Sequence, residues 1–115
     1  MRRGDVYLVD LDLAQGVEAN KSRPAILVSN SAANRSAERH GRGVVTVVPV
    51  TSNTDRVYPF QTRIPVGTAG LAVESKAQAE QIRSVDVSRL LRRLGGLPDT
   101  TLRSLDAAIR LHLGL

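Results

Sequence analysis

An arginine and a threonine stand where they could stabilise extra negative charge on a bound phosphate. Arg23 follows the segment GVEANKS and precedes Pro24, which favours an extended backbone and a position at the mouth of a strand. A guanidinium fixed there can bind a phosphate through two parallel hydrogen bonds. A single arginine is more commonly a solvated surface charge, so the position of Arg23 is what favours a binding role.

Thr51 opens a run of small polar side chains at the end of an apolar segment. The residues VVTVVPV lead into Thr51, Ser52 and Asn53, whose hydroxyl and amide groups donate and accept hydrogen bonds. Because this run lies at the exit of a predicted central strand, we expect it to face a bound phosphate or a base edge.

Two carboxylates could accept a proton beside these groups. Glu18 precedes Arg23 by five residues, and the two either share a site or form a surface ion pair. Glu80 lies in AQAEQIRS, where strand alternation would place Gln78, Glu80 and Ile82 on one face. That face is either the floor of a groove, which we favour, or the solvent side of an edge strand.

The sequence indicates neither a metal site nor a catalytic triad. There is no cysteine, and His40 and His112 are the only histidines, with no third ligand at a metal-binding spacing. We expect His40 in a loop and His112 partly covered on a helix, which disfavours a two-histidine mechanism. The motifs GxGxxG, Walker A and GxSxG are missing, so we expect no cofactor.

Short β-branched runs between turn residues predict the elements that hold these side chains. Pro24 should open its strand, and Pro49 should lie at a sheet edge or bulge because proline lacks the ladder N–H group. Segment 30–42 is predicted to hold one loose helical turn. The six predicted strands cover residues 5–11, 24–29, 43–50, 60–66, 71–75 and 78–85.

Apolar residues recur at helical spacing after Leu97, which predicts a C-terminal amphipathic helix behind Pro98 and Asp99. About six short strands with one helix covering an open end predict a small twisted barrel, so the expected fold class is α+β. The apolar helix positions are Leu102, Leu105, Ile109 and Leu113.

Length and charge fit one domain with a polyanionic partner. The chain has 115 residues and a formal net charge of +5, and residues 1–115 are expected to form a single domain. The basic excess favours nucleic acid. Asp5 and Asp10 interrupt the first apolar run, so we expect no signal peptide, no membrane span and a cytoplasmic protein.

Basic residues gather in two stretches, neither of which is uniformly basic. Apart from Arg23, we interpret each of them as a solvated surface charge. They are Lys21, Arg35, Arg39 and Arg42 around the second predicted strand, and Arg83, Arg89, Arg92 and Arg93 before the helix.

Several segments, in this order, resemble the MazF/PemK/Kid toxins of bacterial toxin–antitoxin modules: RGDVYLVDLD, GVEANKSRPAILVSN, VVPVTSN, YPF and EQIRSVD. The resemblance runs from Arg3 to the C-terminal helix, and the RP pair combined with the EQIR block makes it specific. It implies an SH3-like barrel, a homodimer and metal-independent endoribonuclease activity on single-stranded RNA at short sequence motifs. It also implies a MazE-like antitoxin that occupies the RNA groove.

The resemblance assigns roles to single residues. The family's essential arginine falls on Arg23, its essential threonine on Thr51 and its loop acid on Glu18. The implied reaction is attack by a ribose 2′-OH on the adjacent phosphate, which gives a 2′,3′-cyclic phosphate and a 5′-OH. Glu80, which we favour over Glu18, would take the proton. Gln78 replaces an arginine of some relatives, so the general acid is Arg23 or another group.

Base choice is expected to come from the loops 17–22 and 52–58 and from two glutamines, through hydrogen bonds to exposed base edges. Tyr58 and Phe60 could stack on a base, although we expect Phe60 in the barrel core. The predicted RNA-binding residues are Lys21, Ser52, Asn53, Tyr58, Gln78 and Gln81.

Two other functions suit a small fold of this kind. A gyrase-binding toxin similar to CcdB would cut nothing, but such toxins end in a tail that contains tryptophan, whereas this chain has no tryptophan and ends LHLGL. A small DNA-binding regulator would need a helix-turn-helix pair, which the predicted strands lack. The endoribonuclease toxin is therefore our main hypothesis, and the CcdB-like toxin is the alternative.

Overall fold

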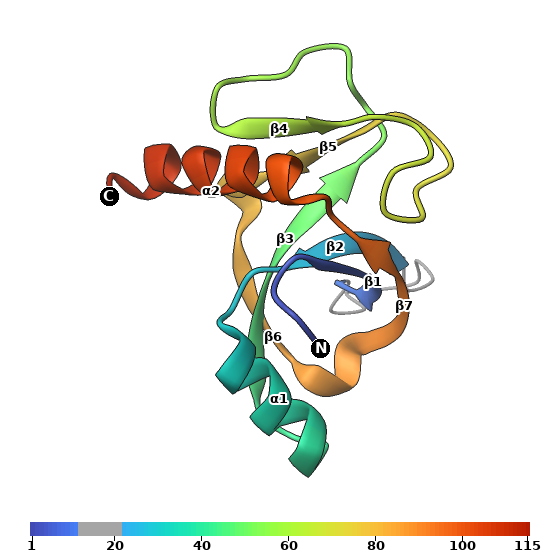
Figure 1. The fold of residues 1–115 in the computed structure, drawn as a ribbon, viewed down its shortest axis with the longest axis vertical. Coiled ribbons are helices and arrows are strands. Elements are labelled where there is room, and N and C mark those ends of the chain that lie inside the picture. Colours follow the sequence, from blue (N-terminus) through green and yellow to red (C-terminus); the bar gives the residue numbers. More distant parts are fainter. Residues whose placement is uncertain (12–21) are drawn as a thin grey trace, which may run out of the picture.

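Residues 1–11 and 22–115 fold into one β-sheet with two helices (Figure 1). A computed structural model describes residues 1–11 and 22–115. The predicted α+β class and the C-terminal helix are confirmed. No helix in the described ranges has the length and apolar character of a membrane span. The elements are β1 (Asp5–Asp10), β2 (Ser22–Leu27), α1 (Ser31–His40), β3 (Val44–Thr51), β4 (Gln61–Ile64), β5 (Ser75–Gln78), β6 (Arg83–Asp86), β7 (Leu90–Gly96) and α2 (Asp99–Leu113), with 3₁₀ turns at Ala79–Gln81 and Val87–Arg89.

β3 is the centre of the sheet. The strands pair antiparallel in the order β4-β5-β3-β2-β1-β7, and β6 also pairs with β3. One edge of β3 is bonded to β2, and the other is bonded first to β6 and then to β5. The pairing therefore establishes a seven-stranded antiparallel sheet where about six strands are predicted.

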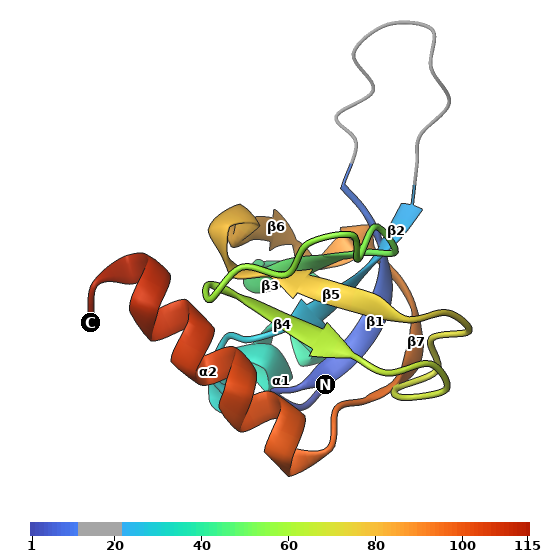
Figure 2. The same cartoon turned by 90° about the horizontal axis from the view of Figure 1, so that it is seen from above.

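The two central strands bury both of their faces. Ile26 and Val48 belong to one apolar cluster, whereas Leu27 and Val47 belong to another on the opposite side of the sheet. α2 covers the first face, packs against β4 and contributes Leu105, and α1 packs against β3 on the second face (Figure 2). This double burial explains why β2 and β3 are nearly continuous apolar runs.

The predicted edge or bulge position of Pro49 is wrong, because this residue lies in a central strand. Pro49 is buried opposite Ala25 of β2. On its other edge, β3 pairs with β6 as far as Val47 and with β5 from Val50 onward. Pro49 therefore lies where β3 changes partner, a place where a residue without an N–H group costs little.

The second half of the sheet differs from the prediction. Leu71 ends a turn in which its carbonyl accepts a hydrogen bond from the Gly67 N–H at 2.8 Å, so of the predicted strand 71–75 only Ser75 lies in a strand, as the first residue of β5. The predicted strand 78–85 is instead the end of β5, a 3₁₀ turn and the start of β6. β7 is not predicted at all, because its sequence LLRRLGG does not alternate and its pairing with β1 contains two register shifts.

Glycine is required where the turn before β5 meets β7. Gly70 has a φ of +77°, and a Cβ atom there would overlap the carbonyl oxygen of Leu94. A Cβ atom at Gly95 would lie 2.5 Å from the carbonyl carbon of Ala69. The two backbones are thus in direct contact, and this contact fixes the turn against β7.

Residues 31–40 form a complete helix where one loose turn is predicted. The side chain of Asn30 caps its first turn, and Gly41 ends it with a left-handed backbone. Asn34 is fully buried and donates a hydrogen bond to the loop before the helix, which anchors α1 to the sheet. His40, predicted in a loop, is the last residue of α1.

Asp5 ties the start of β1 to β7. Its Oδ1 lies 3.1 Å from Nη2 of Arg93, and its Oδ2 accepts a hydrogen bond from the Arg2 backbone at 3.0 Å. Burial by itself raises the pKa of the Asp5 carboxyl, but the hydrogen bonds from Arg93 and Arg2 outweigh it and hold the pKa below its usual 3.8. The ionised carboxylate therefore stabilises the folded chain.

We expect Asp5→Asn to lower the free energy of unfolding at neutral pH by about 1 kcal/mol, because the charge-assisted hydrogen bonds are weakened. The Asp5 pKa is lower in the folded than in the unfolded chain, so its contribution is present above about pH 4 and is lost as the pH falls through the folded-state pKa. Urea unfolding of both proteins between about pH 3 and pH 7 should show this difference closing on the acid side. A difference that is the same at every pH would contradict the assignment.

Candidate functional site

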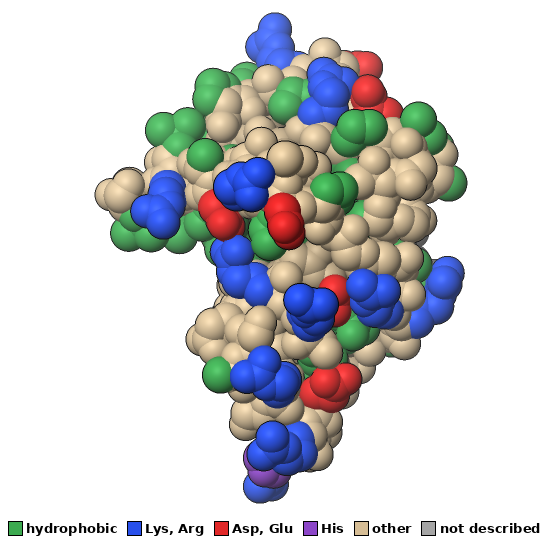
Figure 3. Space-filling view, in the orientation of Figure 1, with side chains coloured by type: hydrophobic (Ala, Val, Ile, Leu, Met, Phe, Trp, Pro, Cys, Tyr) green, Lys and Arg blue, Asp and Glu red, His purple; other side chains and the backbone are tan. Residues whose placement is uncertain are grey.

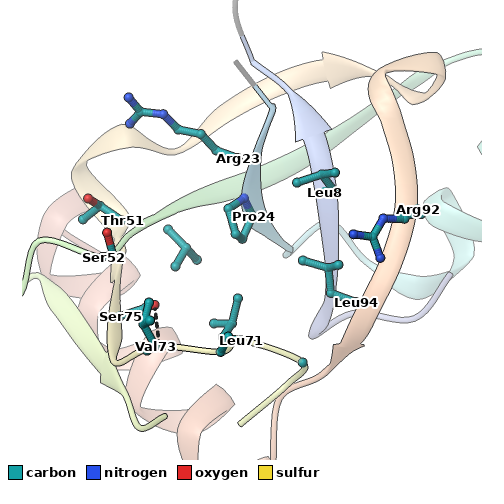
Figure 4. Close-up of a pocket in the computed structure, with 13 residues that line it drawn as sticks. Leu8, Arg23, Pro24, Thr51, Ser52, Leu71, Val73, Ser75, Arg92 and Leu94 are labelled. Carbon is teal, nitrogen blue, oxygen red and sulfur yellow. Dashed lines mark hydrogen bonds between the residues drawn. The ribbon is translucent and has the colours of Figure 1, made fainter. Parts of the chain in front are cut away.

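One cleft collects side chains from five parts of the chain (Figure 4). It has a volume of about 520 Å³ and is lined by β1, the start of β2, the end of β3, the segment 70–75 and β7. Its polar lining residues are Arg23, Thr51, Ser52, Ser75 and Arg92, and its apolar lining includes Leu8, Pro24, Leu71 and Leu94.

The strand order explains how the floor of the cleft forms. Leu8 of β1 pairs with Pro24 of β2 on one side and with Arg92 of β7 on the other. Directly opposite residues share a face of a sheet, so these three side chains form a row across three strands. Arg23 is exposed at the start of β2, and Figure 4 shows its side chain extending above this row on the side of Thr51.

The hydroxyl groups come from the end of β3, as predicted from the sequence. Thr51 and Ser52 both line the cleft, and the Asn53 backbone N–H donates a hydrogen bond to Thr51 Oγ1 at 3.2 Å. This bond holds the hydroxyl oxygen and leaves its hydrogen available to a ligand. Ser75 Oγ, in contrast, donates to the Val73 carbonyl at 3.0 Å.

The cleft is suited to an anion. Arg23 and Arg92 line it, no Asp or Glu does, and neither guanidinium has an ion-pair or hydrogen-bond partner within residues 1–11 and 22–115. Figure 3 shows basic side chains spread over one face of the molecule with acidic groups between them, rather than one continuous basic patch. A preference of the cleft for phosphate must therefore come from Arg23 and Arg92 rather than from a wider basic surface. An unpaired guanidinium is well suited to bind phosphate.

Glu80 is not among the residues that line the cleft. It lies in the 3₁₀ turn after β5, and its Oε2 accepts a hydrogen bond from Gln61 Nε2 at 2.7 Å. Its Oε1 is buried without a hydrogen-bond partner in the described residues. Gln61 Oε1 in turn accepts from the Tyr58 backbone N–H at 3.1 Å, so Glu80 helps to order the connection between β3 and β4.

Aromatic rings and two cations gather in the same connection. Tyr58 and Phe60 are stacked, with ring centroids 5.3 Å apart, and the cations of Arg56 and Lys76 lie 5.6 and 6.0 Å from the Tyr58 ring centroid. The expectation that Phe60 belongs to the core is wrong, because it is half-buried and lies outside both apolar clusters. His112, which we expected to be partly covered, is exposed near Phe60.

The remaining predicted site residues lie away from the cleft or cannot be placed. Gln78 is half-buried at the end of β5, and Gln81 is exposed in the following turn. Neither residue lines the cleft, and neither does Asn53. Glu18 and Lys21 lie outside the described residues.

Arg92 is the cleft residue that sequence reasoning missed. The sequence predicts a solvated surface charge here, because LLRRLGG does not alternate like a strand. The pair Gly95–Gly96 after LLRRL is the one signal in the sequence, because glycine within a strand often marks a place where another backbone approaches closely.

Solved structures show the same fold. A MazE–MazF complex (Form-II) from Deinococcus radiodurans has a TM-score of 0.81 and 26% identity, covering 100% of this chain and 96% of that chain. An endoribonuclease in complex with its cognate antitoxin from Mycobacterial species has a TM-score of 0.79 and 25% identity, with the same coverage of both chains. The sheet and C-terminal helix are therefore those of MazF-like proteins.

Sequence comparison gives the family. A family model described as PemK-like, MazF-like toxin of type II toxin-antitoxin system matches residues 2–113. The chain is 57% identical over 115 residues to Endoribonuclease MazF9 of Mycobacterium tuberculosis, covering 100% of this chain and 98% of that protein. It is 34% identical to Endoribonuclease MazF of Staphylococcus saprophyticus, covering 100% and 92%. The chain belongs to this toxin family, and the predicted membership among the MazF/PemK endoribonuclease toxins is confirmed.

We expect Gln61→Ala to lower the free energy of unfolding by about 1–3 kcal/mol, because it leaves the partly buried Glu80 carboxylate without its donor and the Tyr58 N–H without its acceptor. Gln61→Glu should be worse, since it brings two carboxylates together. Urea unfolding measures both effects. Gln81→Ala, at an exposed position, is the control and should change stability by less than about 0.5 kcal/mol. Equal stability of the two alanine variants would contradict a stabilising role for the hydrogen bonds of Gln61 with Glu80 and Tyr58.

Proposed function

We propose that this protein is a metal-independent, sequence-specific endoribonuclease toxin that cleaves single-stranded RNA. The observation that carries the proposal is the joint placement of Arg23 and Thr51 in one cleft that no acidic side chain of residues 1–11 and 22–115 lines. A cation and a hydroxyl donor beside each other form a minimal site for the extra charge of a phosphoryl transition state. The family and the endoribonucleases that the chain resembles support the same substrate class.

The proposed reaction is an attack of a ribose 2′-OH on the adjacent phosphate. The 2′ oxygen forms a new bond to phosphorus and gives up its proton, and the bond from phosphorus to the 5′ oxygen breaks. The products are a 2′,3′-cyclic phosphate and a 5′-OH end, which gains a proton. Arg23 and the Thr51 hydroxyl would donate hydrogen bonds to the phosphoryl oxygens as their charge rises. Attack in line with the leaving oxygen requires an unstacked backbone, which favours single strands over duplex.

The proton acceptor is proposed to be a carboxylate, either Glu80 or Glu18. Two observations bear on Glu80 in opposite directions. Its Oε1 is free of hydrogen-bond donors in the described residues, so it could take a proton, but the residue does not line the cleft that contains Arg23 and Thr51. Glu18 is close to Arg23 along the chain. Arg23 or a further group would return a proton to the leaving oxygen.

Recognition of the RNA sequence is proposed to use side chains around the cleft and the connection after β3. Hydroxyl, amide and phenol groups can hydrogen-bond exposed base edges, and the exposed ring of Tyr58 can stack on a base. The residues proposed for this task are Lys21, Ser52, Asn53, Tyr58, Gln78 and Gln81.

The proposal includes the partners and the cellular setting of the toxin. We expect a homodimer in the cytoplasm, each sheet closed as an SH3-like barrel, and a cognate MazE-like antitoxin that neutralises the toxin by occupying the RNA groove. The two solved structures described above are an endoribonuclease with its cognate antitoxin and a MazE–MazF complex, which supports this expectation.

We expect Arg23→Ala and Thr51→Ala each to lower the rate of RNA cleavage by about 10²–10³-fold while the fold is retained, because each removes one donor to the transition state. The assay uses purified protein and long single-stranded RNA in EDTA, with the chemistry of the new ends determined. Thr51→Ser keeps the hydroxyl and should retain most activity. Normal cleavage by a folded Arg23→Ala protein would remove that residue from the mechanism, and intact RNA with wild-type protein would overturn the proposed function.

Glu18→Gln and Glu80→Gln separate the two candidate bases. Replacement of the true base should slow cleavage by about 10²–10⁴-fold and remove the rise in rate on the acid side of the pH profile, because the amide cannot accept the proton. Replacement of the other residue should leave the shape of that profile unchanged. If Glu80 only orders the connection through Gln61, Glu80→Gln should change the urea midpoint and not the pH profile. An unchanged acid limb in both variants would contradict the assignment of a carboxylate base.

A further inference from the structure

Consecutive arginines of β7 have different surroundings. Arg93 is paired with Asp5 across 3.1 Å, whereas Arg92 lines the cleft and has no ion-pair or hydrogen-bond partner in the described ranges. Successive side chains of a strand point to opposite faces of the sheet, so the two guanidinium groups leave β7 on different sides. The fold therefore neutralises one arginine and leaves the other available in the cleft.

Arg92 and Arg23 belong to opposite walls of this cleft. Leu8 lies between Arg92 and Pro24 in the cross-strand row, and adjacent strands are about 4.8 Å apart, so the backbones of Arg92 and Pro24 are separated by roughly 10 Å. In Figure 4 the guanidinium of Arg23 lies beyond Pro24 on the side of Thr51, and that of Arg92 lies on the side of Leu94. The two cations are thus placed for two anionic groups.

The surface between the two arginines is apolar. Leu8, Pro24, Leu71 and Leu94 line this part of the cleft, and the contact of the segment at Gly70 with β7 holds its far wall in place. A nucleotide chain presents the same pattern, because each uncharged sugar and base lies between two charged phosphates. An apolar floor with a few well-placed polar groups is typical of a binding site for such a unit.

We propose that Arg92 binds the RNA phosphate adjacent to the one that reacts at Arg23 and Thr51. This assignment rests on the proposed function, and it makes Arg92 a binding residue that selects substrates extending beyond the cleaved linkage. A contact to a phosphate that does not change charge in the reaction stabilises the bound RNA and the transition state equally. Its loss should therefore raise KM and leave kcat unchanged.

The test begins with the cut site that wild-type protein makes in a long single-stranded RNA in EDTA. A labelled oligonucleotide with this sequence and 2′-O-methyl groups cannot be cut, and its affinity is measured by fluorescence anisotropy at several salt concentrations. We expect Arg92→Gln to weaken binding about tenfold and to reduce the slope of log affinity against log salt by about 0.7, the value for one phosphate contact on a single strand. KM for cleavage of the same RNA with free 2′-OH groups should rise by a similar factor, while kcat stays within about twofold of the wild-type value.

The matched control is Arg39→Gln, which removes one positive charge from the exposed surface of α1, on the face of the sheet opposite the cleft. This variant should leave the slope of log affinity against log salt unchanged.

A second experiment replaces one phosphate linkage beside the cut site with a neutral methylphosphonate. This change should weaken binding by the wild-type protein and have no further effect on binding by Arg92→Gln. Wild-type affinity and slope in Arg92→Gln, or a fall in kcat, would overturn the assignment of Arg92. Intact RNA with wild-type protein would instead overturn the proposed function.

Discussion

The pairing of β1 with both of its neighbours is the interaction on which the cleft depends. Leu8 is opposite Pro24 on one side and Arg92 on the other, so residues that are 68 positions apart in the sequence (92 − 24) occupy one row of the sheet. Asp5 secures the same strand to β7 through Arg93. Without this pairing, the chain would still have the cation of Arg23 and the hydroxyl of Thr51, but no second wall to enclose them.

The positive charge of the cleft comes from guanidinium groups that have no partner among the described residues. Most guanidinium groups near the sheet are engaged: Arg93 with Asp5, Arg83 with the Leu11 carbonyl, and Arg3 with Asp106. The cleft contains two that are not engaged with the described residues, and no carboxylate among those residues lines it. Like charges held close together repel each other, and a bound anion relieves that repulsion. The two unpaired cations therefore favour an anionic ligand in the cleft.

The sequence predicts strands β1 to β4 and the C-terminal helix well, and helix α1 and the segments after β4 up to β7 poorly, for a physical reason. The well-predicted elements follow from their apolar runs and apolar spacing, because burial imposes these patterns on them. β7 is interrupted by register shifts, and the turn before β5 is fixed by backbone contact at Gly70, neither of which leaves a periodic pattern. For the same reason Arg23 and Thr51 could be predicted as neighbours from strand ends, whereas Arg92 could not. Glu80 lies in a 3₁₀ turn that alternation cannot describe.

The cleft draws on residues from Leu8 near the beginning of the chain to Leu94 near its end. During synthesis on the ribosome, β2 and β3 emerge long before β7 and cannot complete the cleft by themselves. An interrupted translation product would contain both side chains of the proposed chemistry and still have no place to hold a substrate. Only a nearly full-length product therefore contains both walls of the proposed site.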